Sequence, residues 1–141
     1  MHIGLIEQAA NAINPGFIKR MESGRPYVRL KLAMSLDGRT AMASGESRWI
    51  TGEAARADVQ RLRARSSAIM TGVDTVLADD PSLTVRLDDD DAPRQPLRVI
   101  LDSRLRTPPQ ARLLGLPGET LILSGNPQAA ESAVFAAGVE V

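Results

Sequence analysis

The chain contains no cysteine and few aromatic residues, and each shortage excludes a class of function. Without cysteine, neither disulfides nor thiolate metal sites can form. One Trp, one Tyr and two Phe are too few for the stacking surfaces that hold single-stranded nucleic acid. Lysine plus arginine equals aspartate plus glutamate at 17 each, so no overall field attracts nucleic acid or an acidic membrane.

Long apolar runs are also missing. No stretch approaches the roughly 20 apolar residues that a membrane-spanning helix needs. The N-terminus lacks the basic start and the apolar region of a signal peptide. We therefore expect a cytoplasmic protein, and 141 residues are enough for one domain with its own core.

The apolar pattern predicts strands that alternate with helices. Residues 27–34 alternate in the period of a pleated strand, and shorter apolar runs predict a buried strand at 67–72 and further strands at 97–101 and 120–123. Helices are predicted at 3–13, after Thr51 as N-cap, at 74–78 and after Asn126. This order is typical of an α/β fold with a mostly parallel sheet flanked by helices.

The two ends of the chain differ from its middle. Residues 1–26 are interpreted as a linker or lead-in segment, because Asn14-Pro15-Gly16 interrupts the first helical pattern before the strands begin. Residues 27–141 are expected to form the domain itself. Residues 139–141 have the pattern of a new strand, which predicts a domain that is incomplete at its C-terminus.

Small polar residues follow each predicted strand. In parallel sheets, ligands bind beyond the carboxyl ends of the strands, so these residues predict a binding edge. The simpler interpretation of any one of them is a tight turn. The strand ends concerned are Ser35-Leu36-Asp37-Gly38, Thr71-Gly72, Asp102-Ser103 and Ser124-Gly125.

Several single residues have both a functional and a structural interpretation. Arg63 and Arg86 can grip a phosphate bidentately, although a solvated helix face explains any one arginine of the 56–65 run equally well. Asp79 and its neighbour Asp80 also fit a helix end with a solvated acid, and Trp49 fits a core or lid position. The acidic run at 88–91 lacks the spacing of a calcium loop and is interpreted as a loop, so no metal site is expected.

Five segments, taken in order, form a specific set of motifs: Asn14-Pro15-Gly16-Phe17, Tyr27-Val28-Arg29-Leu30-Lys31-Leu32, and the stretches at 35–41, 45–51 and 75–86. The set resembles the reductase domain of the bacterial bifunctional riboflavin-biosynthesis deaminase/reductase. The resemblance covers about residues 14 to 125 and implies a dihydrofolate-reductase-like fold.

The resemblance also implies an activity and its residues. That family reduces 5-amino-6-(5-phosphoribosylamino)uracil to the ribitylamino product with NADPH as cofactor. Lys31 and Asp79 are expected near the reacting centre, with Asp79 handling a proton or orienting the substrate and Lys31 supporting charge. The implied cofactor contacts are Ala33, Trp49, Thr75, Asp79 and Ser103, and the implied substrate contacts are Ser47, Arg63, Leu83 and Arg86.

The chain departs from the full family pattern in two ways. It has neither the His-x-Glu nor the Cys-x-x-Cys of the zinc deaminase that usually precedes this domain, so the parent protein is expected to carry that domain as a fusion. A glycine-rich cofactor segment expected further along is also missing. The isolated chain is therefore expected to be a fragment with weak or no turnover, and its uncovered sheet edge to favour pairing with another chain in a homo-oligomer.

Two alternatives stay open at this point. One is another dihydrofolate-reductase-like reductase, against which Ser47, Arg63 and Arg86 argue because a pteridine needs no phosphosugar site. The other is a non-catalytic binding or assembly domain that keeps only the scaffold. A competent reductase consumes NADPH and such a binding module does not.

Overall fold

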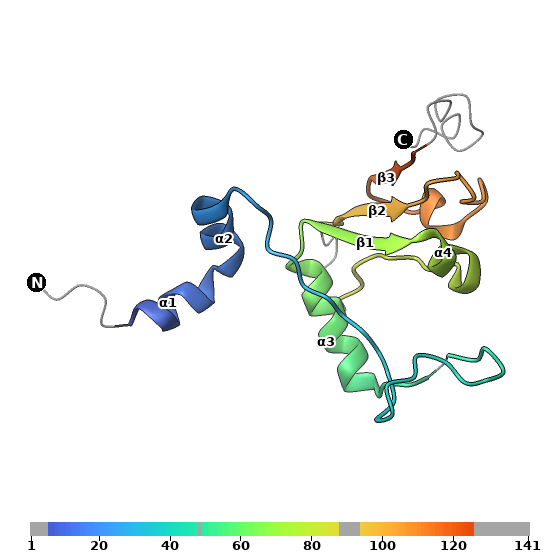
Figure 1. Cartoon of the computed structure of the whole chain (residues 1–141), viewed down its shortest axis with the longest axis horizontal. Helices are drawn as coiled ribbons and strands as arrows, with labels where there is room; N and C mark the ends of the chain where they lie inside the picture. Colours follow the sequence, from blue (N-terminus) through green and yellow to red (C-terminus); the bar gives the residue numbers. More distant parts are fainter. Residues whose placement is uncertain (1–5, 48, 88–93, 126–141) are drawn as a thin grey trace, which may run out of the picture. The chain divides into compact units, whose positions relative to one another are not determined.

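A computed structural model describes residues 6–47, 49–87 and 94–125 of the chain (Figure 1). Its contacts divide the chain into an N-terminal unit, Met1–Ile50, and a C-terminal unit, Thr51–Val141. The two units are considered separately. The expected division at residue 26, between a linker and the domain, stays a prediction.

The N-terminal unit begins with two short helices. Helix α1 spans Glu7–Ile13 and helix α2 spans Pro15–Ser23. Pro15 suits the first turn of α2, where its missing N–H is not needed. Gly24 ends the helix in the left-handed conformation at φ 66°, and its N–H donates to the carbonyl of Arg20 at 2.9 Å. The predicted helix at 3–13 is confirmed over its described residues, Glu7–Ile13.

The predicted strand at 27–34 is wrong. Residues 25–35 form no strand in the N-terminal unit, and the side chains of Val28, Leu30 and Leu32 are 82 %, 81 % and 59 % exposed. The alternating pattern is present in the sequence. A strand also needs a second strand to pair with its backbone, however, and no described segment of this unit pairs with residues 27–34.

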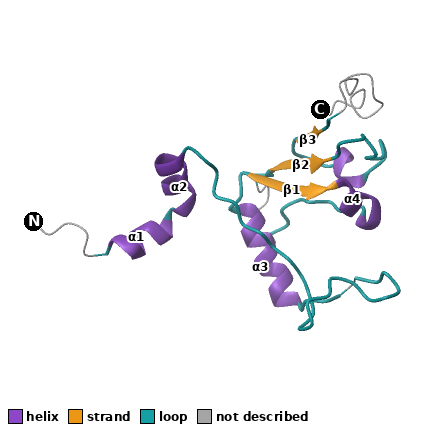
Figure 2. Cartoon of the chain, in the orientation of Figure 1, coloured by secondary structure: helices purple, strands orange, loops and turns teal. Residues whose placement is uncertain are grey.

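The C-terminal unit holds a parallel sheet of three strands, as predicted. In chain order its elements are α3 (Glu53–Ala64), β1 (Ala68–Gly72), α4 (Val73–Asp79), β2 (Leu97–Leu101), a 3₁₀ helix η1 (Arg112–Gly115) and β3 (Thr120–Leu123). The strands pair in the order β1-β2-β3 and all run the same way. Helix α3 ends near the start of β1, and α4 follows the end of β1 directly (Figures 1 and 2).

The core of the C-terminal unit centres on β2, the middle strand. Ile100 of β2, Ile122 of β3 and Leu113 of η1 are fully buried, and Val76 of α4 packs in the same cluster. Burying each such side chain stabilises the fold by about 1.5–3 kcal/mol. This cluster therefore fixes α4 and η1 against the sheet.

Two local predictions for the C-terminal unit need correction. Strand β1 is not buried: its residues alternate between exposed and half-buried, and Met70 is 61 % exposed, because β1 lies at an edge of the described sheet. The residue that caps α3 is Gly52 rather than Thr51, and no side chain caps this helix end. The predicted acidic loop at 88–91, helix after Asn126 and strand at 139–141 lie outside the described residues.

Candidate functional site

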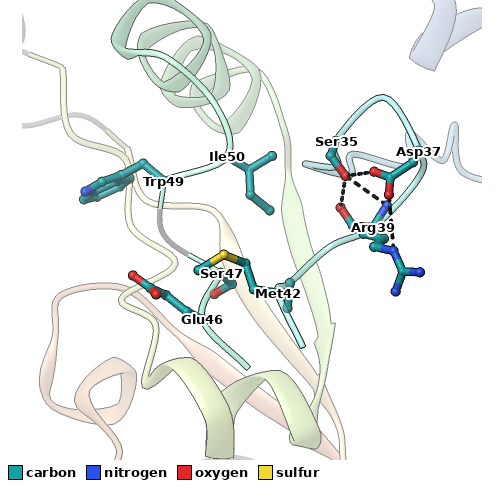
Figure 3. Close-up of a pocket in the computed structure, with 9 residues that line it drawn as sticks. Ser35, Asp37, Arg39, Met42, Glu46, Ser47, Trp49 and Ile50 are labelled. Carbon is teal, nitrogen blue, oxygen red and sulfur yellow. Dashed lines mark hydrogen bonds and ion pairs between the residues drawn. The ribbon is translucent and has the colours of Figure 1, made fainter. Parts of the chain in front are cut away.

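The N-terminal unit contains a hollow of about 440 Å³ between two of the predicted motifs. Ser35, Asp37 and Arg39 line one part of it, and Ser47 and Trp49 line another (Figure 3). The structure thus brings together Ser47 and Trp49, two of the predicted ligand contacts. Trp49 is 73 % exposed, so its indole is accessible to a ligand rather than part of a core.

Hydrogen bonds within the turn fix the polar wall of this hollow. The Ser35 hydroxyl donates to Asp37 Oδ1, and Arg39 Nε donates to Asp37 Oδ2 at 3.2 Å. The hydrogen bond from Ser35, the N–H of Asp37 itself and the bond from Arg39 together hold the pKa of the exposed Asp37 carboxyl below its ordinary value. Gly38, at φ 79°, provides the left-handed residue that this turn requires.

Two other predicted residues of this unit lie outside the hollow. Lys31 is exposed and Ala33 is half-buried, and both belong to the extended segment that precedes Ser35. Their expected roles at the reacting centre and in cofactor binding stay predictions.

In the C-terminal unit, three predicted residues lie in the segments that follow the carboxyl ends of β1 and β2. Gly72 pairs with Leu101, and Leu101 with Leu123, so the three parallel strands end in line. Thr75 lies on α4 just beyond β1, Asp79 ends that helix, and Ser103 follows β2. All three are exposed. Thr75, Asp79 and Ser103 therefore present hydroxyl and carboxylate groups to solvent, whereas Asp102, the carboxylate of the strand-end pattern, is buried and Ser35-Leu36-Asp37-Gly38 follows no strand.

Asp102 fixes the turn that carries Ser103. Its side chain is fully buried, and Oδ2 accepts hydrogen bonds from the N–H and the hydroxyl of Thr107, both at 2.7 Å. Burial alone raises the pKa of Asp102. The N–H of Arg106, the two donors of Thr107 and the N–H of Arg104 outweigh this effect and hold the pKa below its ordinary value.

A second group of predicted residues lies near the other end of β1. Arg63 is in the last turn of α3, and its Nη1 donates to the carbonyl of Thr84 at 3.0 Å. Burial lowers the pKa of Arg63, and the positive charge of Arg86 lowers it further. The two guanidinium groups repel each other, and an anion between them would remove this repulsion, so the pair stays a predicted phosphate contact.

The segment that brings Arg86 to Arg63 has two residues in the left-handed backbone region. Asp80 has φ 40° and Leu83 has φ 50°, and a non-glycine residue in this region is strained by about 1 kcal/mol. Leu83 keeps this conformation because its side chain is only 8 % exposed within the core cluster. Asp80 Oδ1 accepts the N–H of Arg112 at 2.8 Å, which ties the segment to η1.

Sequence reasoning missed two residues at this group. Gln60 Oε1 accepts the N–H of Arg86 at 3.0 Å, and Gln95 bonds both the N–H and the carbonyl of Val85. Neither glutamine belongs to a recognisable motif. The one signal in the sequence is the spacing of Gln60 and Arg63, which places both on one face of α3.

The family model and the curated proteins that match this chain point to the same family. The family model described as "RibD C-terminal domain" matches residues 26–135. The chain is 51 % identical over 136 residues to the riboflavin biosynthesis protein RibD of Haemophilus influenzae, and 54 % identical over 127 residues to that of Escherichia coli. These alignments cover 89 % and 83 % of this chain but only 37 % and 35 % of the two relatives. The chain thus spans about a third of the length of the curated relatives that it matches.

Solved structures agree with the family match. RibD of Acinetobacter baumannii superposes with a TM-score of 0.83 at 51 % identity, over 97 % of this chain and 38 % of that one. A deaminase/5-amino-6-(5-phosphoribosylamino)uracil reductase from Thermotoga maritima superposes with a TM-score of 0.80 at 34 % identity, over 89 % of this chain and 35 % of that one. These relatives confirm the expected α/β, dihydrofolate-reductase-like fold class.

Among the described residues, no helix has the length and apolar character to cross a bilayer. No group of three or more His, Cys, Asp or Glu side chains in the same residues is arranged to hold a metal ion.

Proposed function

Because the chain belongs to the RibD C-terminal domain family, we propose that it forms part of an NADPH-dependent reductase of riboflavin biosynthesis. Its substrate is 5-amino-6-(5-phosphoribosylamino)uracil, the compound in the name of the Thermotoga maritima relative, and its product is the ribitylamino compound. The observation that carries the proposal is the pair Arg63 and Arg86 on the C-terminal unit.

In this proposal the arginine pair binds the phosphate of the substrate. A guanidinium fork matches two phosphate oxygens, and two forks neutralise the dianion. Arg63 is fixed by its bond to Thr84, so its position is set before the substrate binds. Leu83, whose side chain is buried in the core cluster, is a further proposed substrate contact, through a backbone hydrogen bond to the pyrimidine rather than an apolar contact. Ser47 of the N-terminal unit is the further substrate contact.

The carboxyl edge of the sheet is where we propose that NADPH binds. Thr75, Asp79 and Ser103 supply hydrogen-bonding groups there. Ala33 and Trp49 are further proposed cofactor contacts. The edge suits a nucleotide: Gly72 has no atom within 4 Å of where a Cβ would be, and Gly125 meets only the Ser103 carbonyl, at 3.9 Å. When bound, NADPH supplies the hydride.

Two further side chains are proposed to act at the reacting sugar. Opening of the ribosylamine ring and its reduction both need a group that gives or takes a proton. Asp79, exposed at the end of α4 on the carboxyl edge, is the proposed proton-handling or orienting group. Lys31 is proposed to stabilise negative charge. The domain usually follows a zinc deaminase, and a fused deaminase domain in the parent protein is part of the proposal.

The test measures substrate-dependent loss of NADPH absorbance with the full reductase domain of the parent protein, unchanged and with Arg63→Gln or Arg86→Gln. Each variant is expected to raise KM for the phosphorylated substrate about 10- to 100-fold, since one charge-assisted hydrogen bond contributes about 1.5–3 kcal/mol. Arg61→Gln is the matched control, because Arg61 is an exposed arginine on the same helix.

Three results of this test contradict parts of the proposal. A non-catalytic binding domain would consume no NADPH in any version of the domain. Equal KM values for Arg63→Gln and Arg61→Gln would remove the phosphate role of Arg63. Activity on a pteridine in place of the phosphorylated substrate would favour another reductase of the same fold.

A further inference from the structure

Arg63 and Arg86 carry like charges that repel each other. The positive charge of Arg86 is close enough to lower the pKa of the half-buried Arg63. Arg86 itself is exposed and belongs to a segment outside any helix or strand. Repulsion therefore favours movement of Arg86 away from Arg63 when no anion is bound. A stable anion site needs a restraint on the backbone at Arg86.

Gln60 supplies the first restraint. It lies on α3 one turn before Arg63, and its Oε1 accepts the backbone N–H of Arg86 at 3.0 Å. Arg63 bonds the Thr84 carbonyl at 3.0 Å from the same helix. Helix α3 thus holds the chain on both sides of Val85 and keeps Arg86 within reach of Arg63.

Gln95 supplies the second restraint, from the opposite side of the segment. Its Oε1 accepts the N–H of Val85 at 2.8 Å, and its Nε2 donates to the Val85 carbonyl at 3.2 Å. A single side-chain amide thereby makes the pair of bonds that a neighbouring strand would make. Val85 is 3 % exposed, so these bonds also satisfy backbone groups that water does not reach.

We propose that Gln60 and Gln95 are positioning residues of the phosphate site: they hold the backbone of residues 85 and 86 so that Arg63 and Arg86 face one phosphate group. Neither glutamine touches the phosphate in this arrangement. The inference rests on the proposed function for the identity of the ligand. It requires only that the arginine pair binds a sugar phosphate, and not that the chain transfers hydride.

The experiment measures binding of ribose 5-phosphate to the full chain by calorimetry. Gln60→Met keeps the length and helix propensity of the side chain but removes the acceptor. It is expected to weaken ribose 5-phosphate binding about 3- to 10-fold, which is the effect of one hydrogen bond. NADPH affinity, measured by fluorescence titration, is expected to be unchanged. Gln110→Met is the control, because Gln110 is exposed and lies in a turn of the same unit.

The outcomes separate this inference from the proposed function. Wild-type affinity for ribose 5-phosphate in both Gln60→Met and Gln95→Met overturns the positioning role. Equal binding by Arg63→Gln and the wild type removes the phosphate site, and the inference with it. Binding that depends on Gln60 and Arg63, together with no NADPH consumption by the full reductase domain of the parent protein, supports the positioning role and rejects the reductase. A fall in NADPH affinity that matches the fall for ribose 5-phosphate indicates general unfolding and also overturns the inference.

Discussion

Asp102 and Thr107 close the turn that follows β2. One carboxylate oxygen of Asp102 accepts both the N–H and the hydroxyl of Thr107 at 2.7 Å. The other oxygen, Oδ1, is buried and has no hydrogen-bond partner among the described residues. The buried carboxylate is therefore stabilised as an anion by the N–H of Arg106, the two donors of Thr107 and the N–H of Arg104.

This arrangement predicts a loss of stability in acid. The folded pKa of Asp102 is below its ordinary value, so the ionised form favours the folded chain at any pH above the unfolded pKa. This stabilisation is lost as the pH falls from about 4 through the lower folded pKa. Urea unfolding followed by circular dichroism at a series of pH values measures the slope. Asp102→Asn is expected to flatten it in this range, because the amide does not titrate.

Asp58→Asn is the matched control for this slope. Asp58 is an exposed aspartate on α3 of the same unit, so the same chemical change there removes no buried carboxylate. Identical slopes for Asp102→Asn and the wild type would contradict the role given to Asp102.

Substitution of Arg98 is expected to cause a large loss of stability. Its side chain is 1 % exposed, and its guanidinium donates to the carbonyls of Leu116, Pro117 and Gly118 and to the hydroxyl of Thr120, at 2.6 to 3.1 Å. Arg98→Met leaves these acceptors unpaired, which is expected to lower the free energy of unfolding by about 3 kcal/mol or more. Urea unfolding measures this loss. Arg61→Met on the exposed face of α3 is expected to change it by less than about 0.5 kcal/mol.

Any residue other than glycine at position 118 would carry a Cβ that clashes with the side chain of Gln95. Gly118 has φ 101°, and a Cβ there would lie 2.8 Å from the Cβ of Gln95. Gly118→Ala is expected to lower the free energy of unfolding by about 1–3 kcal/mol and to displace Gln95 from Val85. Thermal unfolding measures the first effect. Gly115→Ala is the control, because a Cβ at Gly115 meets no atom within 4 Å. Equal melting temperatures for the two variants would contradict the conflict.

Removal of the ion pair between Arg106 and Asp74 is expected to change the free energy of unfolding very little. The two groups lie 2.7 Å apart, but their side chains are 47 % and 85 % exposed. Water and salt screen such a pair, so Asp74→Asn is expected to change the free energy of unfolding by less than about 1 kcal/mol. Urea unfolding in low and high salt measures this. A loss above about 2 kcal/mol would mean that the pair fixes α4 to the turn after β2.

The sequence predicted the elements whose signals are local. Strands β2 and β3 are short apolar runs that end in small polar residues. The alternation at 27–34 has the same local signal as a strand. The outcome there depends on a backbone partner, which no pattern within residues 27–34 specifies. The exposure of β1 likewise depends on its place at the sheet edge.

The candidate site also contains some residues that the sequence predicts and others that it does not. Arg63 and Arg86 were predicted because arginine and phosphate match chemically and both lie within the span of about residues 14 to 125 that resembles the family, although only Arg86 belongs to one of the five motifs. Gln60 and Gln95 were missed because an amide side chain bonds many partners, and its choice of Val85 or Arg86 depends on the folded path of the chain. The residues that support a site are therefore harder to predict than the residues that touch a ligand.

The side-chain hydrogen bonds that hold Val85 affect how this part of the protein can change in evolution. A segment built into a sheet cannot gain or lose a residue without shifting the register of its neighbours. Residues 84–86 are held by side chains of Gln60, Arg63 and Gln95 instead, so an insertion or deletion nearby leaves the ladder of β1, β2 and β3 intact. Point mutations at the two glutamines can move the segment in small steps. If residues 84–86 belong to the proposed phosphate site, selection for a differently placed phosphate group can act here while the scaffold stays unaltered.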